Sequence, residues 1–274
     1  MSELSPSEHP FSVDSSLETL AISLPETALE IAAHLGLSDL KRATWAWYEL
    51  SGAVLSHYLV DQEARLQRLI HWYYRELGFK PKEDYFGADA ADLGYCLLHK
   101  EGNSTTLAVV LMLLARQLDL VLEPVLLPGH TLLLYKRGKE RRYLDPLSGE
   151  FVTRHYIHAL VRGELGNGAR LKPQHIKPVK LKRLLTRMLH ELKAGCIVSN
   201  RFESALECCN LLLQWHPDDI HIHRERAFIA QQLGCITLAA SDLQYFVEQS
   251  PHDPMIELVK MQLRDLSEHA ETYH

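Results

Sequence analysis

Three residues of the types that cooperate in nucleophilic catalysis follow one another along the middle of the chain. Ser104 stands at the expected start of a long apolar helix, His130 at the head of an expected strand, and Asp145 at the end of the next strand. A serine hydroxyl attacks a carbonyl when a histidine removes its proton, and a carboxylate behind the histidine orients that base. The order of the three residues therefore predicts a catalytic triad.

Each of these residues also has a structural interpretation. Ser104 is placed to cap the helix, because a serine hydroxyl accepts hydrogen bonds from the free N–H groups of a first turn. His130 would be a turn histidine that precedes a strand, and Asp145 would accept from the N–H groups of an Asp-Pro turn. The residue types alone leave both interpretations open.

The other reactive residue types do not predict a second site. Cys96 is followed too soon by a break in the chain for a long apolar helix to start there, so we interpret it as a structural cysteine. The five cysteines contain no Cys-x-x-Cys and are expected to be reduced. Two pairs of histidines lack a carboxylate or thiol at ligand spacing, and we interpret them as solvated histidines: His155 with His158, and His221 with His223. We therefore expect no metal and no other cofactor.

The elements that would position the triad are those of an α+β domain. Apolar residues at helical spacing predict a helix that begins after Asp61 and ends at Gly78, and a core helix over about 104–118. Three β-like runs follow, at 121–127, 131–136 and 141–144. Residues 27–58 are expected to be helical as well. A helical part followed by a small antiparallel sheet is an α+β fold.

A sequence repeat marks the C-terminal part of the chain. Pro217 and Pro251 are 34 residues apart, and so are Ala205 and Ala239, which is the period of tetratricopeptide repeats. The period gives three parts: repeats over about 186–219 and 220–253, and a capping helix over about 254–268. Two repeats are fewer than the three or so that stack stably alone, so we expect them to pack against the rest of the chain.

Charge and chain breaks suggest where the parts of the chain meet. Residues 170–193 carry eight bases and one acid, and the part that follows carries an excess of acids. Glycines and prolines break the chain just before and within this basic stretch. The predicted organisation has four parts: an acidic helical region over 1–60, a core over 61–169, a basic hinge with the start of the first repeat helix over 170–185, and the repeats with the capping helix over 186–270.

The basic stretch has the charge density of a nucleic-acid contact. However, it lacks interleaved aromatic residues, and its leucines recur at helical spacing. We therefore disfavour nucleic acid as a partner. We interpret the stretch as a repeat helix whose charges are solvated or neutralised within the molecule.

Composition is that of a soluble globular protein, with 46% apolar residues and a formal net charge of −6. The longest apolar run, 107–115, is far shorter than the ~18 residues that a membrane span needs. The first ten residues carry two acids and no base, which is the opposite of a signal peptide. We expect a cytoplasmic protein that does not contact a membrane.

Two segments resemble a known family: EGNSTTLAVVLMLLARQLDLVLEPVLLPGHTLLLY and, eight residues later, YLDPLSGE. They are similar to the SirB-type bacterial family, a degenerate branch of the transglutaminase-like superfamily of papain-related thiol enzymes. The family joins a transglutaminase-like core to C-terminal tetratricopeptide repeats, and the resemblance covers about residues 30–268. It implies that 61–169 is a transglutaminase-like core in which His130 and Asp145 match the catalytic positions.

The chain departs from the catalytic pattern of the superfamily at Ser104, where the active enzymes place a cysteine. A thiol at a helix N-terminus beside a histidine can ionise, because its pKa falls from about 8.5 to as low as ~3.5. A serine needs a well-aligned base instead. The resemblance therefore implies an inactive triad.

The expected function is that of a non-catalytic interaction or regulatory protein, linked to regulation of gene expression. It would bind a protein or peptide through the repeats or the old cleft. The alternative is a hydrolase or acyltransferase that uses Ser104, His130 and Asp145. The sequence gives no oligomeric state.

Overall fold

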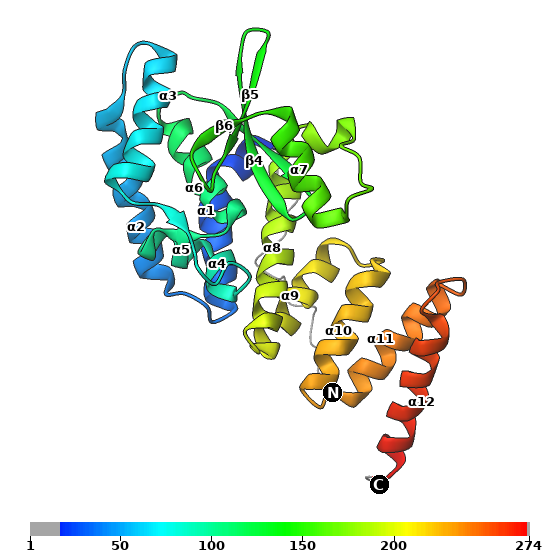
Figure 1. Ribbon diagram of the computed structural model, residues 1–274. Coiled ribbons are helices and arrows are strands. Elements are labelled where there is room, and N and C mark those ends of the chain that lie inside the picture. Colours follow the sequence, from blue (N-terminus) through cyan, green and yellow to red (C-terminus); the bar gives the residue numbers. More distant parts are fainter. Residues whose placement is uncertain (1–16, 273–274) are drawn as a thin grey trace.

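The computed structural model describes residues 17–272 of the chain (Figure 1). A four-stranded antiparallel sheet has its strands side by side in the order of the sequence. The strands are β3 (Leu122–Leu127), β4 (His130–Arg137), β5 (Glu140–Asp145) and β6 (Glu150–Val152). The three predicted β-like runs are confirmed as the first three strands of this sheet, and the fourth follows after a turn.

Helices cover both faces of this sheet. Successive side chains of a strand point to opposite faces, and in β4 the side chain of Leu133 joins the main apolar core with helix α6 (Ser104–Gln117). Its neighbour Leu132 packs in a second cluster with helix α7 (Arg154–Leu165). Almost every residue of α6 is buried, which explains why this helix is apolar nearly all round.

The N-terminal part is helical over most of 27–58, as expected, and a break after His34 divides it into two helices. Helix α1 (Leu17–His34) ends before Gly36, whose φ of +68° is a conformation that favours glycine. Asp39 then caps the first turn of α2 (Leu40–Ala53) by accepting a backbone hydrogen bond at 2.8 Å. A glycine stop and an aspartate cap thus separate the two helices.

The predicted helix after Asp61 is confirmed. The Asp61 carboxylate accepts from the N–H of Ala64 at 2.8 Å and begins α3 (Gln62–His71), which follows the 3₁₀ turn η1 (Val54–His57). The helix continues as one π-helical turn, η2 (Trp72–Glu76). Gly78, with φ +76°, follows its end.

Four short elements lie between this helix and α6, and none of them was expected from the sequence. Strand β1 (Lys80–Pro81) pairs in parallel with β2 (Glu101–Gly102), and between them lie α4 (Ala88–Ala91) and α5 (Leu93–His99). They are too short to show a periodic pattern. Together they lead the chain into the start of α6.

Five helices form the C-terminal part, after a 3₁₀ turn η3 (Pro173–Ile176). They are α8 (Leu181–Val198), α9 (Phe202–Trp215), α10 (Ile220–Gln232), α11 (Ile236–Gln249) and α12 (Ile256–Thr272). Ala205 and Ala239 are fully buried, as the 34-residue period predicts. Over residues 17–272, no helix is long and apolar enough to cross a membrane.

The first repeat packs against the core, as expected for an array of only two repeats. A single apolar cluster includes residues of α1, α6, α8 and α9. Gly195 of α8 lies so close to α4 that an added Cβ would be 2.8 Å from the Ala88 Cα. Ser204 Oγ of α9 donates to the Leu35 carbonyl at 2.8 Å. Helices α10 to α12 extend away from the core (Figure 1).

A buried ion pair joins the two helices of the second repeat. The guanidinium of Arg226 donates from Nε and Nη2 to the carboxylate of Asp242, at 2.7 and 2.8 Å. His223 Nδ1 lies 2.7 Å from the same carboxylate. The expectation that His223 is a solvated histidine is therefore wrong, because the side chain is 14% exposed and belongs to this network.

Candidate functional site

Helix α6 begins at Ser104, but Ser104 does not cap it. The side chain of Asn103 accepts from the N–H groups of Thr105 and Thr106, both at 2.9 Å. Asparagine is among the best N-cap residues, so the preceding position takes this role. The structural interpretation of Ser104 as the helix cap is therefore wrong, and its hydroxyl is left for other partners.

The Ser104 hydroxyl is buried and accepts two hydrogen bonds. The Tyr85 O–H donates to Ser104 Oγ at 3.0 Å, and the backbone N–H of Thr131 donates to it at 3.1 Å. The Ser104 N–H in turn donates to the Tyr85 oxygen at 3.2 Å. Burial raises the pKa of Tyr85, so this phenol keeps the proton that it donates. Only 1% of Ser104 is exposed.

His130 and Asp145 form the pair that the sequence predicts. His130 Nε2 lies 3.1 Å from Asp145 Oδ1, and both side chains are almost fully buried. The Leu147 N–H and the Tyr156 O–H also donate to this carboxylate, at 2.9 and 3.0 Å. Burial raises the pKa of Asp145, but His130, followed by the Leu147 and Tyr156 donors, outweighs burial and holds the pKa below its ordinary value. The carboxylate is therefore charged at neutral pH.

The turn after Asp145 is held by an aromatic residue from the π-helical turn. Tyr74 O–H donates to the Pro146 carbonyl at 2.8 Å. Gly149, with φ +74°, closes the turn by donating to the Asp145 carbonyl at 2.8 Å, and a Cβ there would lie 2.5 Å from the Tyr74 ring. A π-helical turn shifts the side chains that follow it. Here it places Tyr74 under the turn that carries the carboxylate.

The structure thus brings two of the three predicted residues into a hydrogen bond. No hydrogen bond joins Ser104 to His130 within the described part of the chain. With His130 Nε2 beside Asp145, the Nδ1 atom is the one left for a reacting group. The site therefore keeps a histidine–carboxylate pair, while the serine beside it is bonded to Tyr85 and Thr131.

A carboxylate from the repeats also enters this site. Glu191 of α8 accepts from Asn103 Nδ2 at 3.0 Å and from Thr105 Oγ1 at 2.9 Å, the residues on either side of Ser104. Arg187, one turn earlier in α8, donates to the same carboxylate. A small cavity of about 120 Å³ lies beside these contacts, lined by residues of both the core and α8, with the 74% exposed Phe86 among them.

Several of these residues escaped the sequence analysis. Tyr85 lies in a loop 19 residues before Ser104, and its residue type carried no pattern that linked the two. No sequence pattern linked Tyr74 or Tyr156 to the site either. Glu191 did leave a signal, because it is the one acid in the basic stretch 170–193. An isolated acid among bases, on a helix with an apolar face, indicates a specific partner.

Cys96 lies outside this arrangement. Its side chain is fully buried, and burial raises the pKa of the thiol to about 12, which keeps it protonated. The interpretation of Cys96 as a structural cysteine is confirmed. Among residues 17–272, no group of three or more His, Cys, Asp or Glu side chains is arranged to hold a metal.

Two known families match the chain. Residues 47–190, which include Ser104, His130 and Asp145, match the transglutaminase-like superfamily. Residues 192–264 match a tetratricopeptide repeat family. Fold and site therefore define a class of protein in which a transglutaminase-like core is joined to tetratricopeptide repeats.

Relatives that match most of this chain occur in several bacteria. A UPF0162 protein of Vibrio cholerae is 35% identical, over 90% of this chain and 93% of the relative. The UPF0162 protein YchA of Escherichia coli K12 is 31% identical and Protein SirB1 of Salmonella typhimurium 29%, each over 76% of this chain and 78% of the relative. The chain belongs to this SirB-type family of the transglutaminase-like superfamily. No solved structure matches it.

Proposed function

We propose that this chain is a non-catalytic cytoplasmic interaction protein whose transglutaminase-like core no longer performs acyl transfer. One observation carries the proposal: Ser104 Oγ accepts hydrogen bonds from both the Tyr85 O–H and the Thr131 N–H. A hydroxyl oxygen has two lone pairs, and here both accept hydrogen bonds. Neither lone pair is free to attack a carbonyl carbon, and releasing one would leave a buried donor unpaired.

The repeats supply the surface on which a partner would bind. Three large apolar side chains of α10 and α12 are about half exposed: Phe228 on α10, and Leu258 and Met261 on α12. Tetratricopeptide repeats bind extended or helical peptides, and exposed apolar side chains serve as the anchors. The proposed partner is thus a protein or peptide segment. A role in regulation of gene expression rests on the family resemblance alone.

A fluorophosphonate probe tests whether Ser104 is a nucleophile. We expect the intact mass of the full-length protein to show no adduct, under conditions in which a known serine hydrolase is labelled completely. The Ser104→Ala variant gives the background from other hydroxyls. Stoichiometric labelling that disappears in this variant would overturn the proposal. It would support the second candidate, a Ser-dependent hydrolase or acyltransferase, which the intact His130–Asp145 pair favours.

A further inference from the structure

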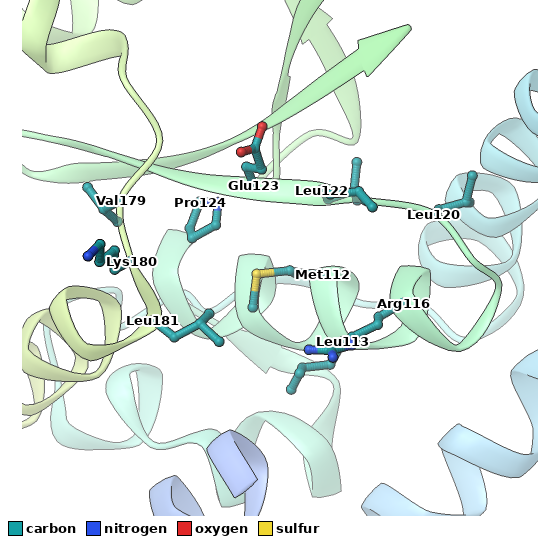
Figure 2. A pocket seen from close by; sticks show the side chains of 11 residues that line it. Met112, Leu113, Arg116, Leu120, Leu122, Glu123, Pro124, Val179, Lys180 and Leu181 are labelled. Carbon is teal, nitrogen blue, oxygen red and sulfur yellow. The ribbon is translucent and has the colours of Figure 1, made fainter. Parts of the chain in front are cut away.

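A larger cavity, of about 420 Å³, lies toward the opposite end of α6 from Ser104 (Figure 2). It opens between three segments that are distant in the sequence. They are the C-terminal half of α6, strand β3 with the two residues before it, and residues 179–181 at the start of α8. Its size falls within the ~300–1,000 Å³ of typical small-molecule sites. Neither the triad nor the repeats account for it.

The inner wall of this cavity is apolar. Four lining side chains are almost completely buried and come from α6 and the β3 segment: Met112, Leu113, Leu120 and Leu122. Figure 2 shows Met112 between α6 and β3, with Leu181 and Val179 closing the end next to α8. Such a wall favours the hydrocarbon part of a ligand, because burying apolar surface is favourable by ~25 cal/mol per Å².

The mouth of the cavity is positively charged. Arg116 and Lys180 line it and are exposed, and neither has an ion-pair partner among the residues that the structure describes. In Figure 2 the guanidinium of Arg116 lies beside Leu113. The one acid in the lining, Glu123, points its carboxylate away from the cavity in this view and pairs with Lys136. Two cations therefore face an incoming ligand without a competing carboxylate.

The edge of strand β3 adds a hydrogen-bond donor. The Val179 N–H donates to the Pro124 carbonyl at 2.8 Å, so the Pro124 backbone faces the outer edge of the sheet. Leu122 is two residues away, and its backbone therefore faces the same edge. Its N–H has no partner in the described part of the chain. Leu122 is one of the residues that line the cavity.

We propose that this cavity binds a medium-chain monocarboxylate, with the hydrocarbon chain against Met112 and Leu120 and the carboxylate at Arg116 and Lys180. The site combines an apolar wall with a few polar groups that fix orientation, which is the usual composition of a small-molecule site. The cavity shares no residue with the Ser104 site, so this proposal does not depend on the proposed function.

Calorimetry on the full-length protein tests the charge requirement, with octanoate and its neutral analogue octanol as probes. We expect saturable binding of one octanoate, tighter than that of octanol. The Arg116→Gln/Lys180→Gln variant should weaken octanoate about tenfold, since two exposed ion pairs are lost, and leave octanol unchanged. A matched control, Lys41→Gln/Lys139→Gln, removes two exposed cations elsewhere and should bind like the native protein. Absent binding, or equal affinity for both probes, overturns the proposal.

A photoreactive diazirine carboxylate tests the location. Crosslinks should map to peptides that contain 112–124 and 179–181, and excess octanoate should suppress them. This readout needs no variant to fold. Crosslinks on the exposed apolar residues Trp45 and Tyr48 would contradict the site. Binding of an extended acidic peptide in this cavity, together with no binding of octanoate, would also contradict the proposal.

Discussion

Ser104 keeps its hydroxyl proton at any pH at which proteins fold, whereas a cysteine at the same position would not. The two donors that occupy its oxygen, Tyr85 O–H and Thr131 N–H, would stabilise a negative charge if one could form there. The first turn of α6 acts in the same direction, because a helix N-terminus favours an anion. The surroundings of position 104 would thus stabilise a thiolate, but the residue there is a serine, whose hydroxyl stays protonated.

A Ser104→Cys substitution should therefore produce a thiol whose pKa lies below the ordinary value of about 8.5. The ultraviolet absorbance of the thiolate, followed against pH and corrected by subtracting the native protein, measures it. Adding Tyr85→Phe removes one donor and should raise the pKa again. A thiol of unshifted pKa in the single variant would mean that these donors and His130 do not act on this position.

Asp92 makes the stability of the fold depend on pH, with the opposite sign to the contribution of Asp145. It is 2% exposed and caps α5 by accepting from the Gly94 N–H at 2.7 Å, yet burial raises the pKa of its carboxyl to about 6. The unfolded chain, with a pKa of 3.8, therefore loses this proton first as the pH rises. The contribution of Asp92 to stability is fully present below pH 3.8 and is lost as the pH rises through about 6.

The Asp92→Asn variant keeps the cap but cannot ionise. Its stability relative to the native protein should rise as the pH increases through this window, by up to ~3 kcal/mol. Urea unfolding at a series of pH values measures the difference. A difference that does not change with pH would show that the raised pKa of Asp92 makes no contribution to folding.

At the scale of elements, the contact between α8 and α4 depends on one missing side chain. A Cβ on Gly195 would lie 2.8 Å from the Ala88 Cα and 2.9 Å from its nitrogen, and both are backbone atoms that cannot rotate away. The Ala88 N–H also donates to Ser199 Oγ at 3.1 Å, in the same contact. Glycine at 195 therefore sets the distance between the repeats and the core.

Gly195→Ala should destabilise the protein by ~1–3 kcal/mol, although alanine is the better helix former. Gly163→Ala is the control, because Gly163 also lies in a helix but has nothing within 4 Å of an added Cβ. That variant should be stabilised by up to ~1 kcal/mol. Thermal and denaturant unfolding of both variants provide the measurement. Equal effects of the two substitutions would contradict the close contact.

Long elements were predictable and short ones were not, for a physical reason. The repeat helices bury one face over many residues, so their apolar residues recur often enough to show a period. Helix α6 is buried nearly all round and is marked by a long apolar run instead. Helix α4 has four residues, and its three buried alanines show no period at all. The triad positions were found because each lies at the end of a predictable element. Their partners were not, because Tyr85 and Glu191 approach through tertiary packing.

At the scale of the whole molecule, the apolar interior is continuous from the core into the first repeat. One cluster contains residues of α6, α8, α9 and α10, and a smaller cluster around Phe246 joins α10 to α11 and α12. The second repeat therefore depends on the first, and the first depends on the core. Two repeats alone fall below the number that stacks stably.

A fragment of residues 178–274 should accordingly fold poorly. We expect weak near-ultraviolet circular dichroism and a broad thermal transition, because the face of α8 that packs on α4 would be exposed to water. The full chain should unfold in one main step. A monomeric fragment that melts sharply at the temperature of the full chain would show instead that the repeats are an autonomous unit.

The reach of Glu191 into the site has a consequence for communication across the molecule. Its carboxylate fixes Asn103 and Thr105 at the head of α6, yet it belongs to the helix on which the repeats are built. A partner that draws α8 away from the core must break both hydrogen bonds, and so it loosens the residues around Ser104. Thermodynamic reciprocity then requires that anything which tightens this end of α6 weakens such a partner by the same factor. Under the proposed function, the Ser104 site would in this way respond to the partner that binds the repeats.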